Sequence, residues 1–85
     1  MSKSLKLEEQ FEQIIEKVKN SQVDKDPGMA DKLKLYAWYK QAKVGDVQGD
    51  EPTDFVGKMK YQAWSKIKGM SKDEAMKSYI NYFSK

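Results

Sequence analysis

The sequence predicts an all-α protein that folds as a four-helix bundle. Four segments repeat apolar residues at the three- and four-residue spacing of a helix face, and no segment shows the apolar and polar alternation of a strand. Glycine and proline fall mainly between these segments, where they favour turns. At 85 residues, the chain is expected to form one domain, residues 1–85, around one core.

The first helix is expected from about Leu5 to Asn20. Its apolar face consists of Leu7, Phe11, Ile14, Ile15 and Val18. The acidic residues of this segment fall on the polar side or flank of that face, where they are expected to be solvated.

The second helix is expected to end at about Val44. Asp26 and Pro27 resemble an N-cap followed by proline at the first helical position. Gly45 can adopt the left-handed conformation that closes a helix end.

This second helix has two different faces, because successive residues are about 100° apart. The side expected to join the core carries Leu35, Trp38 and Ala42, with Tyr39 on its flank, and the opposite side carries Leu33, Tyr36, Ala37 and Lys40. The latter side places an apolar residue, a ring and an ammonium group in one row, which suits an amphipathic anion. The alternative is that Tyr36 is a half-buried core ring and Lys40 an ordinary surface lysine.

The third helix follows a connector over residues 46–53, and either Thr53 or Asp54 is expected to cap it. Gly69 is expected to end it. Its predicted stripe is Val56, Met59, Ala63 and Ile67, with Trp64 at the edge.

The fourth helix is expected to start with a capping box formed by Ser71 and Glu74. Its apolar face is Met76, Tyr79, Ile80 and Phe83. The short turn before it predicts that the third and fourth helices are antiparallel, whereas the connector after Gly45 is long enough to cross one end of the bundle.

Composition disfavours an enzyme. The chain has no histidine and no cysteine, so it lacks the usual general base at neutral pH, a thiol nucleophile and the commonest metal ligands. An esterase would need an unusual pair of carboxylates, and none is evident. We therefore expect no catalytic residues, no metal and no cofactor.

Charge is unevenly distributed along the chain. Residues 1–31 contain five lysines and seven acids, whereas residues 32–85 contain eleven lysines and six acids. An anionic ligand is therefore expected to meet the later helices. The absence of arginine and the interspersed acids disfavour nucleic acid as the partner.

Targeting signals are not evident either. The start of the chain lacks the apolar stretch of a secretory signal, and no apolar run approaches the roughly 20 residues of a membrane span. We expect a cytoplasmic protein that does not insert into membranes and is monomeric.

Lys58 and Lys60 lie two residues apart in the third helix and therefore point in nearly opposite directions. Lys60 borders the predicted stripe, close to Trp64 and Ile67, and is the better ligand candidate. The alternative is that its stem covers the Trp64 indole while its ammonium group stays in water.

Three blocks of this chain resemble the acyl-CoA-binding protein family. They read, in order, YAWYKQAKVGD at residues 36–46, DFVGKMKYQAW at residues 54–64 and KGMSKDEAMKSYI at residues 68–80. The resemblance spans nearly the whole chain, and the first block is its most specific part. It implies an up-down-down-up four-helix bundle with a shallow, bowl-shaped site for long-chain acyl-CoA.

The resemblance also implies site residues. Tyr36 and Lys40 match family ligands of the phosphate-bearing nucleotide, with Tyr39 in the same run, and Lys60 matches a second phosphate-binding lysine. The remaining matches are Tyr79 as a contact to the coenzyme, Leu33 on the acyl path and Lys19 near the adenine. The implied role is a non-catalytic intracellular carrier and pool former, which can exchange its ligand with acyl-CoA-using enzymes.

Two other classes of function compete with this interpretation. A single-stranded nucleic-acid binder would use the same lysines and rings, but its affinity would depend steeply on salt and not on acyl length. A helical protein-interaction module would bind a partner helix in an apolar groove, and CoA esters would not stabilise it.

Overall fold

The computed structural model describes residues 6–84, and four helices account for its regular structure. They are α1 (Leu7–Lys19), α2 (Met29–Lys43), α3 (Phe55–Lys66) and α4 (Lys72–Ser84). No strand occurs between residues 6 and 84, so the all-α prediction is confirmed. The expected start of the first helix at Leu5 lies outside the described residues.

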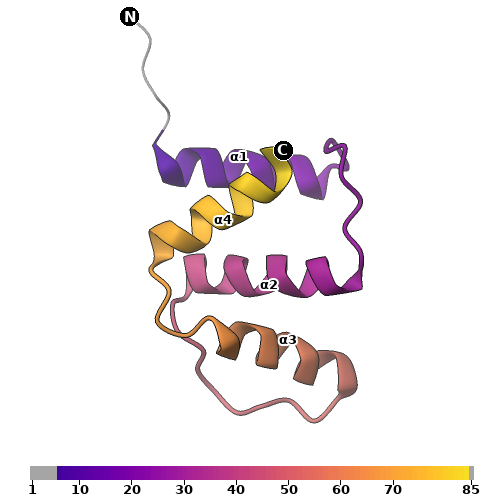
Figure 1. Ribbon diagram of the computed structural model, residues 1–85, viewed down its shortest axis with the longest axis vertical. Coiled ribbons are helices and arrows are strands. Elements are labelled where there is room, and N and C mark those ends of the chain that lie inside the picture. The colour runs from indigo at the N-terminus through magenta and orange to yellow at the C-terminus, as the bar shows by residue number, and fades with distance from the viewer. Residues whose placement is uncertain (1–5, 85) are drawn as a thin grey trace, which may run out of the picture.

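The helices run up, down, down and up, as predicted (Figure 1). Helix α2 lies between α3 and α4 and packs against both, and α1 packs against α4. The connector from α2 returns along α3, so α2 and α3 are parallel, whereas α4 runs in the opposite direction (Figure 1). None of the described helices is long and apolar enough to cross a membrane.

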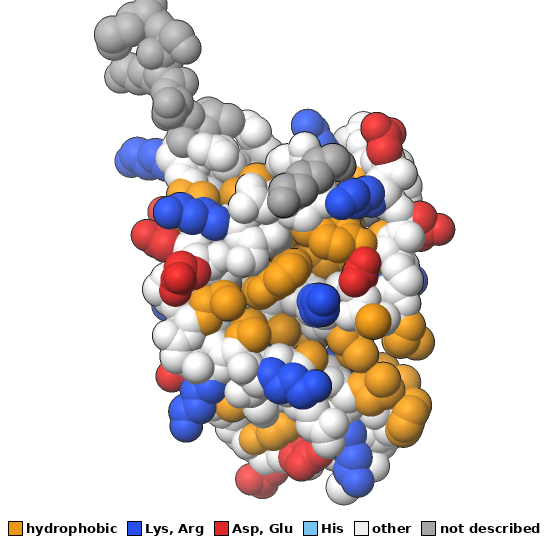
Figure 2. All heavy atoms as spheres, in the orientation of Figure 1, with side chains coloured by type: hydrophobic (Ala, Val, Ile, Leu, Met, Phe, Trp, Pro, Cys, Tyr) orange, Lys and Arg blue, Asp and Glu red, His pale blue; other side chains and the backbone are white. Residues whose placement is uncertain are grey.

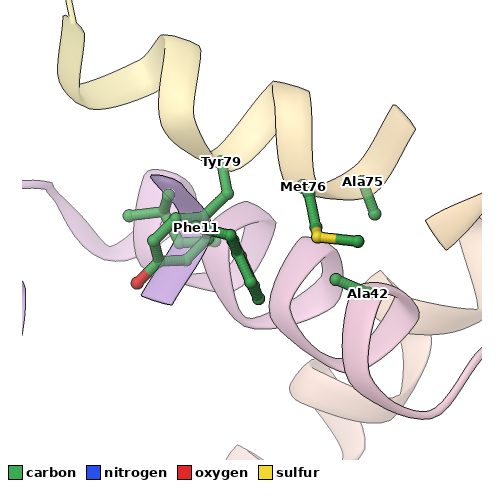
Figure 3. Packing of buried hydrophobic residues seen from close by; sticks show 6 residues of the cluster. Phe11, Ala42, Ala75, Met76 and Tyr79 are labelled. Atoms are coloured by element: carbon green, nitrogen blue, oxygen red, sulfur yellow. The ribbon is translucent and has the colours of Figure 1, made fainter. Parts of the chain in front are cut away.

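The core lies where α1, α2 and α4 meet. Tyr79 and Met76 extend from α4 toward α2, and the Phe11 ring from α1 packs edge-on against the Tyr79 ring, with centroids 5.3 Å apart (Figure 3). Leu35 and Ala42 complete the α2 side of this core. These residues belong to the apolar faces expected from helical spacing.

The expected start of α2 was wrong. Gly28, not Asp26, occupies the N-cap position, it has extended backbone, and no side chain caps the helix. The preceding connector is held against α4, because the Lys25 ammonium donates to the Tyr82 carbonyl at 2.6 Å and lies 4.4 Å from the Tyr82 ring centroid. Pro27 is therefore part of the connector and not the first residue of the helix.

The predicted stripe of α3 also needs correction. Trp64, placed at its edge, is the buried residue of this helix, whereas Val56 is 52 % exposed. The reason is that α3 contacts only α2 among the other helices, so one narrow side of it is covered. On α2, Ala37 is buried although it lies opposite the core, because α3 packs there.

The ends of the helices follow the remaining sequence predictions. Asp54 caps α3 by accepting a hydrogen bond from the Gly57 amide at 2.8 Å. Ser71 and Glu74 form the capping box of α4, in which the Glu74 amide donates to the Ser71 hydroxyl at 3.0 Å. Gly45 has a φ of 104°, in the left-handed region, directly after the C-cap residue of α2.

A buried polar network joins α2 to α3 and to the turn before α4. Gln41, 1 % exposed, donates from Nε2 to Asp46 Oδ1 and to the Met70 carbonyl, both at 2.8 Å. The Trp64 indole donates to Gln41 Oε1 at 3.1 Å and to the Gly45 carbonyl at 2.8 Å. Because these buried polar groups satisfy one another, the network fixes the register of the two parallel helices.

Candidate binding site

Two ammonium groups and two aromatic rings come together where α2 meets α3. Lys60 Nζ lies 5.3 Å from the centroid of the Tyr36 ring, and Lys40 Nζ lies 5.2 Å from the Trp64 ring. Both distances allow a cation–π attraction. We call Tyr36, Lys40, Lys60 and Trp64 the lysine cluster.

Local structure positions these side chains. Tyr36 and Lys40 are one turn apart on α2, and Lys60 and Trp64 are one turn apart on α3, so each helix contributes one row. The Gln41 and Trp64 hydrogen bonds hold the two rows at the same level. The cluster therefore presents two positive charges at one helix–helix boundary, which suits a ligand with more than one phosphate.

Tyr39 and Tyr79 form a second group around Phe11. The Tyr39 ring lies 6.3 Å from the Phe11 ring and the Tyr79 ring 5.3 Å from it, on different helices. Burial raises the pKa of Tyr79 above its ordinary value of 10.0, and the nearby Tyr39 raises it further. Tyr79 is therefore neutral at pH 7 and can take part only as a hydrogen-bonding or packing group.

Leu33 lies apart from both groups, although it is on the same side of α2 as Tyr36. It lines an apolar groove of about 500 Å³ between α2 and α3, to which Tyr36, Lys40 and Lys60 do not contribute. Lys19, the last residue of α1, is exposed. Within residues 6–84 it shares no hydrogen bond, ion pair or ring contact with the other predicted site residues.

The structure thus brings Tyr36 and Lys60 into contact and places Lys40 beside them, while Tyr39 and Tyr79 meet through Phe11. Sequence reasoning missed Trp64 as the partner of the Lys40 ammonium. The parallel register of α2 and α3 would have identified this pair. Helical spacing within one segment gives no information on the register between two helices. No group of three or more metal-ligating side chains occurs in the part of the chain that is described.

Comparison with known proteins identifies close relatives. The model of the family described as "Acyl CoA binding protein" matches residues 8–83. An acyl-CoA-binding protein homolog of Drosophila melanogaster is 43 % identical over 76 residues, which cover 87 % of this chain and 86 % of the fly protein. Acyl-CoA-binding domain-containing protein 3 of Oryza sativa is 45 % identical over 76 residues, but the match spans only 48 % of that longer protein.

Solved structures agree with these sequence relatives. The crystal structure of Oryza sativa acyl-CoA-binding protein 2 superimposes with a TM-score of 0.78 at 41 % identity, over 89 % of this chain and 84 % of that one. The acyl-CoA-binding protein of Moniliophthora perniciosa superimposes with a TM-score of 0.79 at 34 % identity, over 92 % of this chain and 77 % of the other.

Proposed function

Because the chain belongs to the acyl-CoA-binding protein family, we propose that it binds long-chain acyl-CoA esters and acts as their carrier and pool former without catalysing a reaction. The observation that carries this proposal is the lysine cluster. Two ammonium groups on different helices, each beside an aromatic ring, match the phosphates and the adenine of a CoA head group.

The head group gives specificity in this mechanism. Each charge-assisted hydrogen bond from Lys40 or Lys60 to a phosphate contributes roughly 1.5–3 kcal/mol. An adenine stacked on an aromatic ring contributes about 1–3 kcal/mol, by analogy with base stacking. Lost freedom of the ligand opposes these terms by several kcal/mol, so the head alone binds weakly.

The acyl chain follows the row that precedes Tyr36 on α2. Leu33 and Met29 lie one and two turns before Tyr36 on the same side of the helix, and Val56 lies one turn before Lys60 on α3. Met29 is 66 % exposed and Val56 52 %, so apolar surface is available to a chain that leaves the lysine cluster in this direction. Each methylene removed from water contributes about 0.8 kcal/mol, and the chain therefore supplies most of the affinity.

The remaining features of the proposal concern the cell. We propose a monomer in the cytoplasm that receives acyl-CoA from, and delivers it to, acyl-CoA-using enzymes. Lys19, Tyr39 and Tyr79 complete the proposed head-group site, with Tyr79 acting through its neutral side chain. No cofactor and no metal take part.

Calorimetric titration tests the proposal. Palmitoyl-CoA, octanoyl-CoA, free CoA and palmitate are titrated at two salt concentrations. We expect one-to-one binding of palmitoyl-CoA, at least tenfold weaker binding of octanoyl-CoA and much weaker binding of either half alone. No heat and no thermal stabilisation with any CoA ester would refute the function, and affinity that falls steeply with salt but ignores acyl length would indicate a nucleic-acid binder.

A further inference from the structure

Lys43, in the last turn of α2, reaches across to α1. Its ammonium group forms an ion pair with the Glu12 carboxylate and lies 5.8 Å from the centroid of the Phe11 ring. Phe11 is the ring that Tyr39 and Tyr79 both meet. Within the described part of the chain, no other ion pair joins two side chains. Lys43 is therefore a further positive charge beside the residues that we propose to bind the head group.

This ion pair joins two helices that do not pack directly against each other. Among the four described helices, α1 packs only against α4, and α1 and α2 run in opposite directions (Figure 1). The Lys43 side chain is 39 % exposed and that of Glu12 is 56 % exposed. Exposed ion pairs contribute little to stability, because water solvates both charges when they separate. Lys43 can therefore exchange Glu12 for another anion at little cost to the fold.

Lys43 also extends the lysine cluster along α2. It lies three residues after Lys40, and residues at this spacing are neighbours on the surface of a helix. Over the face seen in Figure 2, lysines and acidic side chains are interspersed, so positive charge is not concentrated there. Against this mixed background, the end of α2 places a third ammonium group next to the two of the lysine cluster.

The order of groups in a CoA ester indicates the partner of Lys43, a step that rests on the proposed function. From the acyl end, the ester runs through pantetheine and the diphosphate to a ribose that carries its own phosphate. The proposed acyl path leads toward the start of α2, past Leu33 and Met29. The ribose phosphate then lies on the other side of the diphosphate, toward the end of α2, where Lys43 follows Lys40. A phosphate monoester carries a charge of about −1.5 to −2 at pH 7, so it attracts Lys43 more strongly than the Glu12 carboxylate does.

We propose that Lys43 binds the ribose phosphate of acyl-CoA and that Glu12 competes with this phosphate for Lys43. When the ester binds, the Lys43 ammonium exchanges the Glu12 carboxylate for the phosphate, and the carboxylate is left to water. Lys43 thereby determines how strongly the protein prefers CoA esters to esters that lack the ribose phosphate. Glu12 lowers the affinity, because its ion pair with Lys43 must be broken first.

Calorimetric titration with palmitoyl-CoA and with palmitoyl-dephospho-CoA, which lacks the ribose phosphate, tests the role of Lys43. Lys43→Gln should weaken palmitoyl-CoA binding about tenfold and leave palmitoyl-dephospho-CoA binding within about twofold of wild type. The control Lys77→Gln removes the same charge at an exposed position on α4 and should leave both affinities within about twofold. If wild type binds palmitoyl-CoA, equal weakening of both esters by Lys43→Gln, or no weakening of either, would overturn this inference alone. If wild type binds neither ester, the proposed function is refuted together with it.

Substitution of Glu12 tests the competition. Glu12→Gln should tighten palmitoyl-CoA binding about threefold, because Lys43 no longer has to leave a carboxylate before it meets the phosphate. In the Lys43→Gln background, the same substitution should no longer change the affinity. The control Glu8→Gln makes the same change of charge one turn earlier on α1. Equal tightening by Glu8→Gln, or undiminished tightening by Glu12→Gln in the Lys43→Gln background, would refute the competition, since only general electrostatic attraction would then remain.

Discussion

Lys40 and Lys60 each have an aromatic ring within cation–π distance. This contact restricts the long lysine side chain and so reduces the entropy that would be lost in the phosphate binding that we propose. A phosphate forms stronger bonds with the ammonium group than a ring does, so the ring does not compete effectively. In the proposed complex the two rings support the lysines, and the half-buried Tyr36 ring also offers a surface for the adenine, whereas the Trp64 ring is buried.

Substitution of Lys60 on α3 tests its proposed role in binding a phosphate. Lys60→Ala should weaken palmitoyl-CoA binding roughly tenfold to a hundredfold, because one charge-assisted contact of about 1.5–3 kcal/mol is lost. Lys58→Ala is the matched control, since Lys58 is also exposed on α3 but makes no ring contact among the described residues. Calorimetry should find Lys58→Ala within threefold of wild type, and equal losses in the two variants would contradict the role of Lys60.

Helix α3 depends on its N-cap at Asp54. It packs only against α2, and Phe55 and Val56 in its first turn are largely exposed. Few tertiary contacts therefore stabilise its start, and the Asp54 cap supplies a larger share of the local free energy. This start also carries Val56, which we propose as part of the acyl path.

Removal of the Asp54 cap should destabilise the protein. Asp54→Ala should lower the free energy of unfolding by about 1 kcal/mol, because the Gly57 amide loses its acceptor. Thr53→Ala is the control, as the sequence offered Thr53 as the alternative cap and the structure uses Asp54. Urea denaturation measures both variants, and a greater loss in Thr53→Ala would contradict the observed capping.

At the scale of the whole molecule, α2 is the element on which the other parts depend. It contributes to the core with one side, contacts α3 with another and supplies half of the lysine cluster. The Gln41 network connects its C-terminal end to the turn at Gly69, since Asp46 Oδ1 accepts from the Gly69 amide at 2.8 Å. Loss of this network should loosen the register of α2 and α3 and with it the site.

The network predicts a pH dependence of stability. The hydrogen bonds from the Gly69 amide and from Gln41 hold the pKa of Asp46 below its ordinary value of 3.8. A lowered pKa in the folded state means that this stabilisation is present above about pH 4 and is lost as the pH falls through the lowered pKa. Wild type should therefore lose urea resistance in this acidic range.

Asp46→Asn should be less stable than wild type at pH 7 and should lose less stability between pH 5 and pH 2. Asp50→Asn serves as the control, because Asp50 is exposed in the same connector and has no hydrogen-bond partner among the described residues. Urea midpoints measured across this range should be parallel for Asp50→Asn and wild type. A slope in Asp46→Asn as steep as that of wild type would contradict the assignment.

Apolar spacing determined that the chain forms four helices and which faces of α1 and α4 enter the core. Turn and capping residues determined where three of the helix ends lie, although the sequence left the cap of α3 open between Thr53 and Asp54. These properties depend on residues within a few positions of one another, as at Gly45, Asp54 and Ser71. The resemblance of three sequence blocks further identified the family and the predicted ligand residues. These blocks were sufficient because they carry specific side chains at fixed spacing.

Only the tertiary structure decided which side chains meet. The pairing of Lys40 with Trp64, the burial of Ala37 and Gln41 and the groove beside Trp38 all depend on how α3 lies against α2. The late start of α2 likewise accompanies a contact between Lys25 in the preceding connector and Tyr82, which is 57 residues away. The physical reason is the same in each case: helical periodicity determines the direction of a side chain on its own helix, but packing between helices determines what that side chain contacts.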